Sequence, residues 1–249
     1  MKKSIIATIT ATALCLSFGV FAGEVSKSEI SKKIQSITPF KVKSVTDSES
    51  GMYEIVTGKG IFYSTKDGEY LLSGSIHKFE PGLLNLTNER KAEFAQVDID
   101  KLRSTFITYK APEEKYEVIV FFDTSCGYCQ KMHKEISQYN AAGITVHYAM
   151  YPRNGISKPS ANGDVYTPTY NKMMTIVCSD DPETSMNMVM RGTTLPPKSC
   201  ANSIKEHYEL GAQLGVRGTP AVYGMNGKSV MGGYGPAQTL LKNLTEAKG

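Results

Sequence analysis

A Cys-Gly-Tyr-Cys motif at residues 126–129 constrains this chain more than any other feature. It follows an apolar, strand-like run at residues 118–122 and opens a helix-like segment from Gln130 to Tyr139. The positive end of a helix dipole favours the thiolate form of Cys126, which lowers its pKa. Cys129 lies one helical turn further on, where it can attack a mixed disulfide and release the substrate. The pattern predicts a thiol–disulfide oxidoreductase.

A structural zinc site is the alternative interpretation of a Cys-x-x-Cys pair, because such a pair often supplies two of four ligands. The other mature cysteines, Cys178 and Cys200, are far apart and form no second pair. His133 would supply only a third ligand. The context of strand followed by helix favours redox chemistry, and we predict neither a metal nor a cofactor.

Residues 1–22 have the pattern of a secretory signal peptide. Lys2 and Lys3 precede an uncharged apolar stretch, and Val20-Phe21-Ala22 supplies a small-x-small cleavage site. The stretch is short and rich in Ser and Thr for a membrane span. Cys15 invites a lipoprotein interpretation, but Leu14 stands where a small residue is needed. We therefore expect export to the periplasm and loss of Cys15 with the signal.

The mature chain then contains four cysteines, and an even number in an exported protein suggests two disulfides. The obvious division is a reactive pair, Cys126 and Cys129, and a structural bridge, Cys178–Cys200. A loop of that length would contribute about 3 kcal/mol to stability. The alternative is that Cys178 and Cys200 form a second redox couple.

Composition and charge exclude several kinds of partner. The formal net charge of the chain is +4, and loss of Lys2 and Lys3 leaves about +2. This balance does not favour nucleic acid or lipid headgroups as partners. No stretch after the signal is long and apolar enough to enter a membrane.

The rest of the chain predicts a small α+β module, a connecting helix and a larger α/β domain. Residues 23–84 combine a helical pattern at 24–37 with short alternating strands separated by Gly-containing turns. Residues 85–104 form the expected linker helix, although an ordinary surface helix of one continuous domain would look the same. A module this small is marginal alone, and its exposed sheet edge predicts pairing with a second copy.

From residue 105 to 249 the predicted order is strand, strand, helix, strand, helices, strand, strand, helix. Residues 220–223 and 228–231 form a hairpin around an Asn-Gly turn, and a helix beginning with Pro236 ends the chain. This order fits a thioredoxin-like α/β domain with a helical insertion. The Gly-, Pro-, Ser- and Asn-rich residues 153–169 are expected to form a loop of unassigned role.

A second motif, Gly218-Thr219-Pro220-Ala221, places a proline at a strand start, where its missing N–H is tolerated. Together with the cysteine motif, His133, Cys178 and Cys200, it makes the chain similar to the DsbC/DsbG group of periplasmic disulfide isomerases. The resemblance covers essentially the whole mature chain. The dipeptide Gly127-Tyr128 resembles that of DsbC more than the Pro-Tyr of DsbG.

This resemblance implies a V-shaped homodimer that acts on misfolded, disulfide-containing proteins and also has chaperone activity. It implies that Cys126 attacks, that Cys129 resolves, and that the Thr219–Pro220 bond is cis and lies beside Cys126 to bind extended substrate. Cys178–Cys200 would match the family's structural disulfide. An isomerase must start reduced, so a membrane electron donor of the DsbD type is also implied.

Several side chains near the motifs have competing interpretations. Thioredoxins carry a buried Asp six residues before the first cysteine, where this chain has Val120, which argues against a plain thioredoxin reductase. Arg217 is expected to be a solvated arginine rather than a partner of the thiolate, and His133 a helix-surface residue rather than a proton carrier. Tyr128 either contacts substrate or tunes the thiolate, or it is a spacer.

The methionines at 173, 174, 186, 188 and 190 suggest core packing more than copper binding, because residues i and i+2 of a helix face different directions. The rival functions are a DsbG-like reductase, a DsbA-like oxidase, and a chaperone whose redox chemistry is secondary.

Overall fold

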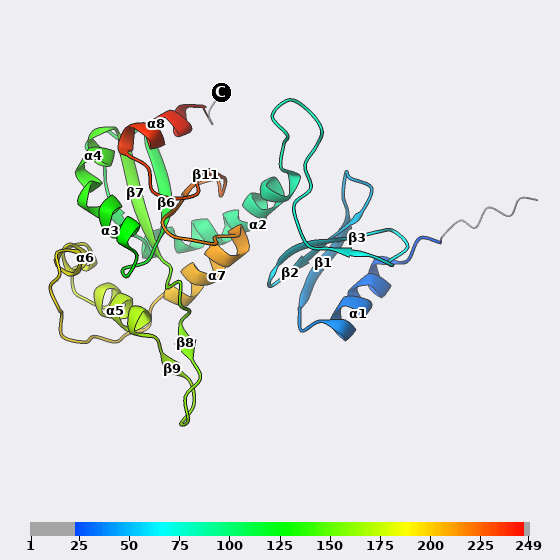
Figure 1. Cartoon of the computed structure of the whole chain (residues 1–249), viewed down its shortest axis with the longest axis horizontal. Coiled ribbons are helices and arrows are strands. Elements are labelled where there is room, and N and C mark those ends of the chain that lie inside the picture. The colour runs from blue at the N-terminus through cyan, green and yellow to red at the C-terminus, as the bar shows by residue number, and fades with distance from the viewer. Residues whose placement is uncertain (1–22, 247–249) are drawn as a thin grey trace, which may run out of the picture.

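The computed structural model describes residues 23–246. The predicted signal peptide, including Cys15, lies outside these residues. Within them, no helix combines the length and the apolar character needed to cross a bilayer. Figure 1 shows two lobes that are joined by the helix α2.

The N-terminal lobe packs one helix on a four-stranded antiparallel sheet, as the alternating pattern predicts. The helix α1 (Lys27–Ile37) begins with a capping box between Ser26 and Glu29. Its buried face, Ile30 and Ile34, packs against Tyr53 and Ile55 of the sheet. The strands follow in the order β1 (Val42–Asp47), β2 (Tyr53–Thr57), β3 (Gly60–Ser64), β4 (Leu71–Leu72).

The strand β4 is an edge strand, and its side chains are not covered. Leu71 is 42% exposed and Leu72 is 44% exposed. The loop that follows adds further exposed apolar side chains, with Phe79 at 98% and Leu83 at 54%. Pairing with a second copy was predicted from an exposed sheet edge alone, and the structure adds that apolar side chains lie on the β4 edge.

The helix α2 (Leu86–Leu102) contacts both lobes. Near its start, Thr87 shares a 2.7 Å hydrogen bond with the hydroxyl of Tyr63 on β3. Further along, Ala95 and Ile99 are fully buried against the helix α7 (Ile204–Leu214). Val97 of the same helix is 75% exposed, and the small residue Ala95 makes the close contact.

The C-terminal lobe contains a five-stranded mixed sheet in the order β11-β10-β6-β7-β5, which confirms the predicted α/β class. The central strands β6 (Tyr116–Phe122) and β7 (Ile144–Met150) are parallel, and the other pairs are antiparallel. The outer strands are β5 (Ile107–Tyr109), β10 (Ala221–Gly224) and β11 (Ser229–Met231).

Alternate residues of β6 point to opposite faces of this sheet, and both faces are covered. Val118, Val120 and Phe122 belong to the larger apolar cluster, which also contains both motif cysteines. Ile119 and Phe121 face α2 and α7. The larger cluster is covered by α3 (Gly127–Lys134), α4 (Ile136–Ala141), α5 (Pro168–Val177), α6 (Pro182–Met190) and α8 (Ala237–Glu246).

Two local predictions were wrong in detail. The helix expected over Gln130 to Tyr139 is broken at Glu135, where the backbone leaves helical geometry between α3 and α4. The expected loop at 153–169 contains a short hairpin of β8 (Ser157–Lys158) and β9 (Val165–Tyr166), seen projecting below the lobe in Figure 1. Both strands are only two residues long, which is below the length that a period-two pattern reveals.

The helical insertion is closed by a disulfide between Cys178 and Cys200, whose Cα atoms are 5.6 Å apart. Met173 and Met186 of the insertion are fully buried and Met190 nearly so, in agreement with core packing. Met188 points away from them and is 40% exposed.

Replacing both Cys178 and Cys200 by serine is expected to lower the free energy of unfolding by about 3 kcal/mol, because the 22-residue loop then gains freedom in the unfolded chain. Urea denaturation under non-reducing conditions measures the change. The alkylation rate of Cys126 should stay the same, since the bridge is separate from the motif. A loss below about 1 kcal/mol would contradict a stabilising role for the bridge.

Candidate active site

The cysteine motif begins where the buried strand β6 turns into the helix α3. Cys126 is the N-cap residue of α3, with extended backbone geometry, and Gly127 is its first helical residue. An N-cap residue precedes backbone N–H groups that have no partner inside the helix. These N–H groups therefore point toward the sulfur of Cys126, which is where a thiolate needs donors.

The two cysteines are free and differ in their surroundings. Cys126 is 3% exposed at the rim of the site, whereas Cys129 is fully buried in the apolar cluster beneath it. Sequence reasoning placed these two residues one turn apart, and the structure places them so that only Cys126 reaches the surface. This arrangement suits an attacking thiol with a second thiol behind it.

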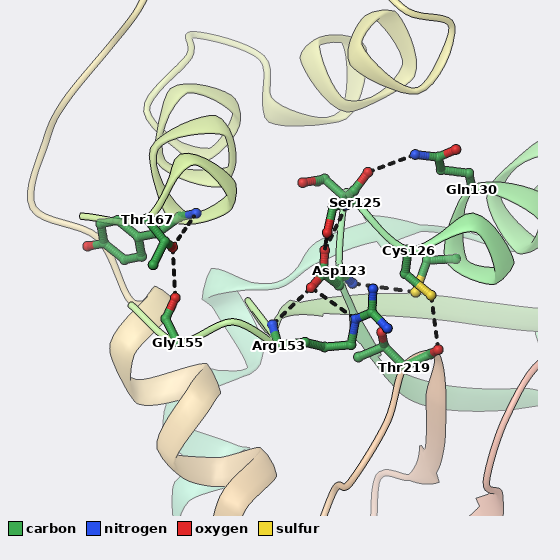
Figure 2. Close-up of polar contacts among 11 residues, drawn as sticks. Asp123, Ser125, Cys126, Gln130, Arg153, Gly155, Thr167 and Thr219 are labelled. Carbon is green, nitrogen blue, oxygen red and sulfur yellow. Dashed lines mark hydrogen bonds and ion pairs between the residues drawn. The ribbon is translucent and has the colours of Figure 1, made fainter. Parts of the chain in front are cut away.

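The loop that contains Thr219 and Pro220 leads into β10, the strand next to β6, and its Thr219–Pro220 bond is cis. The thiol of Cys126 donates a 3.1 Å hydrogen bond to the carbonyl oxygen of Thr219 (Figure 2). The hydroxyl of Thr219 is buried and has no partner among the described residues. It is available to donate to a sulfur once the thiol loses its proton.

These surroundings move the pKa values of the two thiols in opposite directions. Burial acts to raise the pKa of Cys126, but the Thr219 hydroxyl, which can donate to the thiolate, and the backbone N–H groups of Cys129 and Tyr128 outweigh it and lower the pKa overall. Burial raises the pKa of Cys129 to about 12, although the backbone N–H of Asp123 acts in the opposite direction. At neutral pH, thiolate therefore forms preferentially on Cys126.

Asp123 is a site residue that the sequence analysis did not single out. Its carboxylate is fully buried and accepts four hydrogen bonds, two from Ser125 and two from Arg153 (Figure 2). Its backbone N–H donates to the sulfur of Cys129 at 3.4 Å. The only signal available in the sequence was a charged residue directly after a buried strand and next to the motif.

The Asp123–Arg153 pair connects the motif to the segment that carries the β8–β9 hairpin. The backbone N–H of Arg153 and its Nε donate to the same carboxylate oxygen at 2.9 and 3.2 Å. Two residues later, Gly155 accepts a hydrogen bond from the hydroxyl of Thr167, which caps α5. The segment 153–167 is thus fixed at its base to the active-site loop.

The prediction that His133 lies on the helix surface was wrong. His133 is 7% exposed, with its ring 5.4 Å from that of Tyr109 and 5.9 Å from that of Tyr148. Burial lowers the pKa of His133 to about 4, so the ring is neutral at physiological pH. The expectation for Arg217 agrees with the structure, in which its side chain is exposed. Burial lowers the pKa of Lys91, and the charge of Arg217 lowers it further.

Val120, at the position of the buried acid of thioredoxins, is a fully buried core residue. Tyr128 is 64% exposed and stacks on Tyr234. Across residues 23–246, no three His, Cys, Asp or Glu side chains converge in a way that would hold a metal ion.

The chain resembles known proteins over both lobes. Residues 102–248 match the family model of a thioredoxin-like domain, and residues 22–88 match that of the disulfide bond isomerase protein N-terminal domain. The thiol:disulfide interchange protein DsbC of Escherichia coli (strain K12) is 36% identical over 198 residues, 79% of this chain and 78% of that protein.

DsbC of Haemophilus influenzae is 34% identical over 221 residues, covering 87% of this chain and 89% of that protein. Among solved structures, a disulfide interchange protein from Neisseria gonorrhoeae is 25% identical, with a TM-score of 0.46, over 57% of this chain and 95% of that one.

Alkylation of the reduced protein should show a single fast thiol, because only Cys126 has a lowered pKa. The alkylation rate should fall tenfold per pH unit below that pKa and level off above it. The pH at which it levels off should be lower than for an unperturbed cysteine. Thr219→Val removes the hydroxyl donor and should move the profile to higher pH. A profile unchanged by Thr219→Val would contradict the role of this hydroxyl. The control is Thr175→Val, a half-buried threonine on α5 outside the site.

Asp123→Ala should lower the free energy of unfolding by about 1–3 kcal/mol, because it removes a buried acceptor of four hydrogen bonds and the ion-pair partner of Arg153. Asp180→Asn is a matched control, since Asp180 is fully exposed and its pair with Lys198 should contribute below about 1 kcal/mol. Urea denaturation measures both. Equal effects of the two substitutions would contradict the buried role of Asp123.

Proposed function

The chain belongs to the DsbC family of thiol:disulfide interchange proteins and is a thiol:disulfide isomerase, and we propose that it rearranges incorrect disulfides in the periplasm through Cys126. The observation that carries this proposal is the contrast between the two thiols. One has a lowered pKa at the rim of the site, and the other is fully buried with a pKa of about 12.

In the first step, the thiolate of Cys126 attacks one sulfur of a substrate disulfide. A bond forms between the two proteins, the substrate disulfide breaks, and the second substrate sulfur leaves as a thiolate. That thiolate attacks another disulfide of the substrate. The thiolate released there, or another substrate thiolate, then displaces Cys126, so that electrons balance without any external oxidant.

A competing step ends the reaction with reduction. Cys129 loses its proton, attacks the sulfur of Cys126 and releases a reduced substrate, which leaves a disulfide between the two cysteines. Because burial keeps the pKa of Cys129 near 12, very little thiolate is present at neutral pH and this step is slow. Slow resolution gives a bound substrate time to rearrange before it is released.

Several proposed elements surround this chemistry. Gly127 and Tyr128 separate the two cysteines by one helical turn. The backbone of Thr219, beside Pro220, pairs with extended substrate. A DsbD-type membrane donor returns the oxidised enzyme to its reduced form. Export follows from the signal-like residues 1–22. The disulfide Cys178–Cys200 is consistent with an oxidising compartment.

We further propose a homodimer in which the edge strand β4 pairs with a second copy, because Leu71 and Leu72 are exposed there beside the apolar loop containing Phe79. In this proposal, residues 23–84 form the dimerisation domain, residues 85–104 the linker helix, and residues 105–249 the catalytic domain. Two catalytic lobes held by one dimer would enclose an unfolded substrate between them. An unfolded chain held between the two lobes would be kept from aggregating, which would provide the chaperone activity.

The test is recovery of activity from a substrate with scrambled disulfides. Cys126→Ala should abolish recovery, since no mixed disulfide can form, while suppression of aggregation by this variant should persist. Efficient oxidation of a reduced substrate without recovery of a scrambled one would instead indicate an oxidase.

Replacing Leu71 and Leu72 with glutamate should yield monomers by light scattering and reduce recovery at least several-fold, because two charges on the paired edge repel their copies. Val97→Glu, an exposed apolar residue on α2, is the control. A dimer that survives the double substitution would contradict pairing through β4.

A further inference from the structure

Two tyrosines form an aromatic surface beside the nucleophile. Tyr128, the second residue of the motif dipeptide, is 64% exposed. Its ring lies 6.1 Å from that of Tyr234, with an interplanar angle of 19°. Tyr234 comes from the segment between β11 and α8, more than a hundred residues away in the chain. The pair is therefore assembled by the fold and is not a local feature of the motif.

Two contacts of Tyr234 and one of its neighbour Gly235 fix this segment to residues 131–139. The hydroxyl of Tyr234 donates a 2.7 Å hydrogen bond to the carboxylate of Glu135. The ammonium of Lys131 lies 4.5 Å from the centre of its ring. The carbonyl oxygen of the next residue, Gly235, accepts a buried 2.6 Å hydrogen bond from Tyr139. A ring fixed in this way is preorganised and loses little freedom when another group packs on it.

The position of Tyr128 places this surface next to the reacting sulfur. The backbone N–H of Tyr128 faces the sulfur of Cys126, and its side chain projects from the same first turn of α3. In a mixed disulfide the two sulfurs are about 2.05 Å apart. Successive residues of an extended substrate then follow at about 3.3 Å intervals. A residue directly beside the substrate cysteine therefore lies within reach of the Tyr128 ring.

The chemistry of the surface favours an aromatic side chain. Tyr128 contributes little buried area to the fold, and the ring face that is not stacked on Tyr234 is open to solvent. Aromatic rings prefer offset-stacked or edge-to-face packing, which a further ring can adopt on the exposed ring of Tyr128. An aliphatic side chain would gain only the burial of its area.

We propose that Tyr128 and Tyr234 form a docking surface for an aromatic residue adjacent to the cysteine of a substrate disulfide. This inference rests on the proposed function, because it specifies which substrates Cys126 attacks fastest. Stacking of one ring corresponds to about a 3- to 10-fold increase in the rate of mixed-disulfide formation.

The experiment uses the reduced, mature protein and two peptides that differ only in having Phe or Ala beside one cysteine. Each cysteine carries a thionitrobenzoate group as a mixed disulfide. Thionitrobenzoate is the better leaving group, so Cys126 forms its bond with the peptide sulfur and the coloured thiolate is released. The ratio of the Phe and Ala rates isolates the docking surface, because the attacking thiol is common to both reactions.

The expected ratio is about 3 to 10 for the wild-type protein and close to 1 for Tyr234→Ala. Tyr234 is partly buried, so its replacement could also disturb the fold. Tyr128→Leu is a second variant at an exposed position, where the fold should not change, and it should also lower the ratio toward 1. Tyr166→Ala is the control. Tyr166 is 54% exposed and stacks on Tyr170, outside the docking surface, so this variant should keep the wild-type ratio.

A wild-type ratio close to 1 would overturn the proposal, as would a ratio that both Tyr234→Ala and Tyr128→Leu preserve. A third peptide with Leu in place of Phe tests the aromatic preference, and a rate equal to that of the Phe peptide would overturn it. The proposed function fails separately, if the protein shows the Phe preference but does not recover a scrambled substrate.

Discussion

The active site depends on the abrupt change from a fully buried strand to a helix at Cys126. β6 ends at Phe122 and α3 begins at Gly127, so only four residues carry the chain out of the core and into a helix start. This places one cysteine where free backbone N–H groups converge and the other one turn deeper, against apolar side chains. The difference in pKa between two chemically identical thiols follows from this geometry, because one sulfur meets hydrogen-bond donors and the other mainly meets apolar surroundings.

A short loop at such a position needs support, and it comes from groups that are distant in the sequence. The carboxylate of Asp123 is buried without a large penalty because four donors surround it, including the charged side chain of Arg153. The carboxylate of Asp123 therefore forms an ion pair. The buried acid of thioredoxins has a different role, since it assists the resolving thiol. On the opposite side, the Thr219 loop supplies the acceptor for the Cys126 thiol and a hydroxyl for its thiolate. Both supports hold the sulfur in place while leaving it reachable from solvent.

The helix α2 relates this site to the N-terminal lobe. Arg90 near its start pairs with Glu54, whose side chain is only 4% exposed, and Ala95 and Ile99 pack on α7 further along. One continuous helix with a polar contact at one end and a close apolar contact at the other ties the small lobe to the catalytic one. The small lobe is marginal by size alone, so these contacts with α2 and α7 contribute to its stability.

The sequence by itself determined the class of the fold, the order of most helices and strands, and the two cysteines of the site, because periodicity and motif spacing are local properties. Only the tertiary structure decided which polar side chains are buried. His133 is polar and was expected on the helix surface, but Tyr109 of β5 and Tyr148 of β7 enclose its ring. Asp123 gained its role from Arg153, thirty residues away, and Tyr128 gained a stacking partner in Tyr234. These pairs form where distant segments meet across the sheet or at its ends, and no local pattern in a single sequence encodes such a meeting.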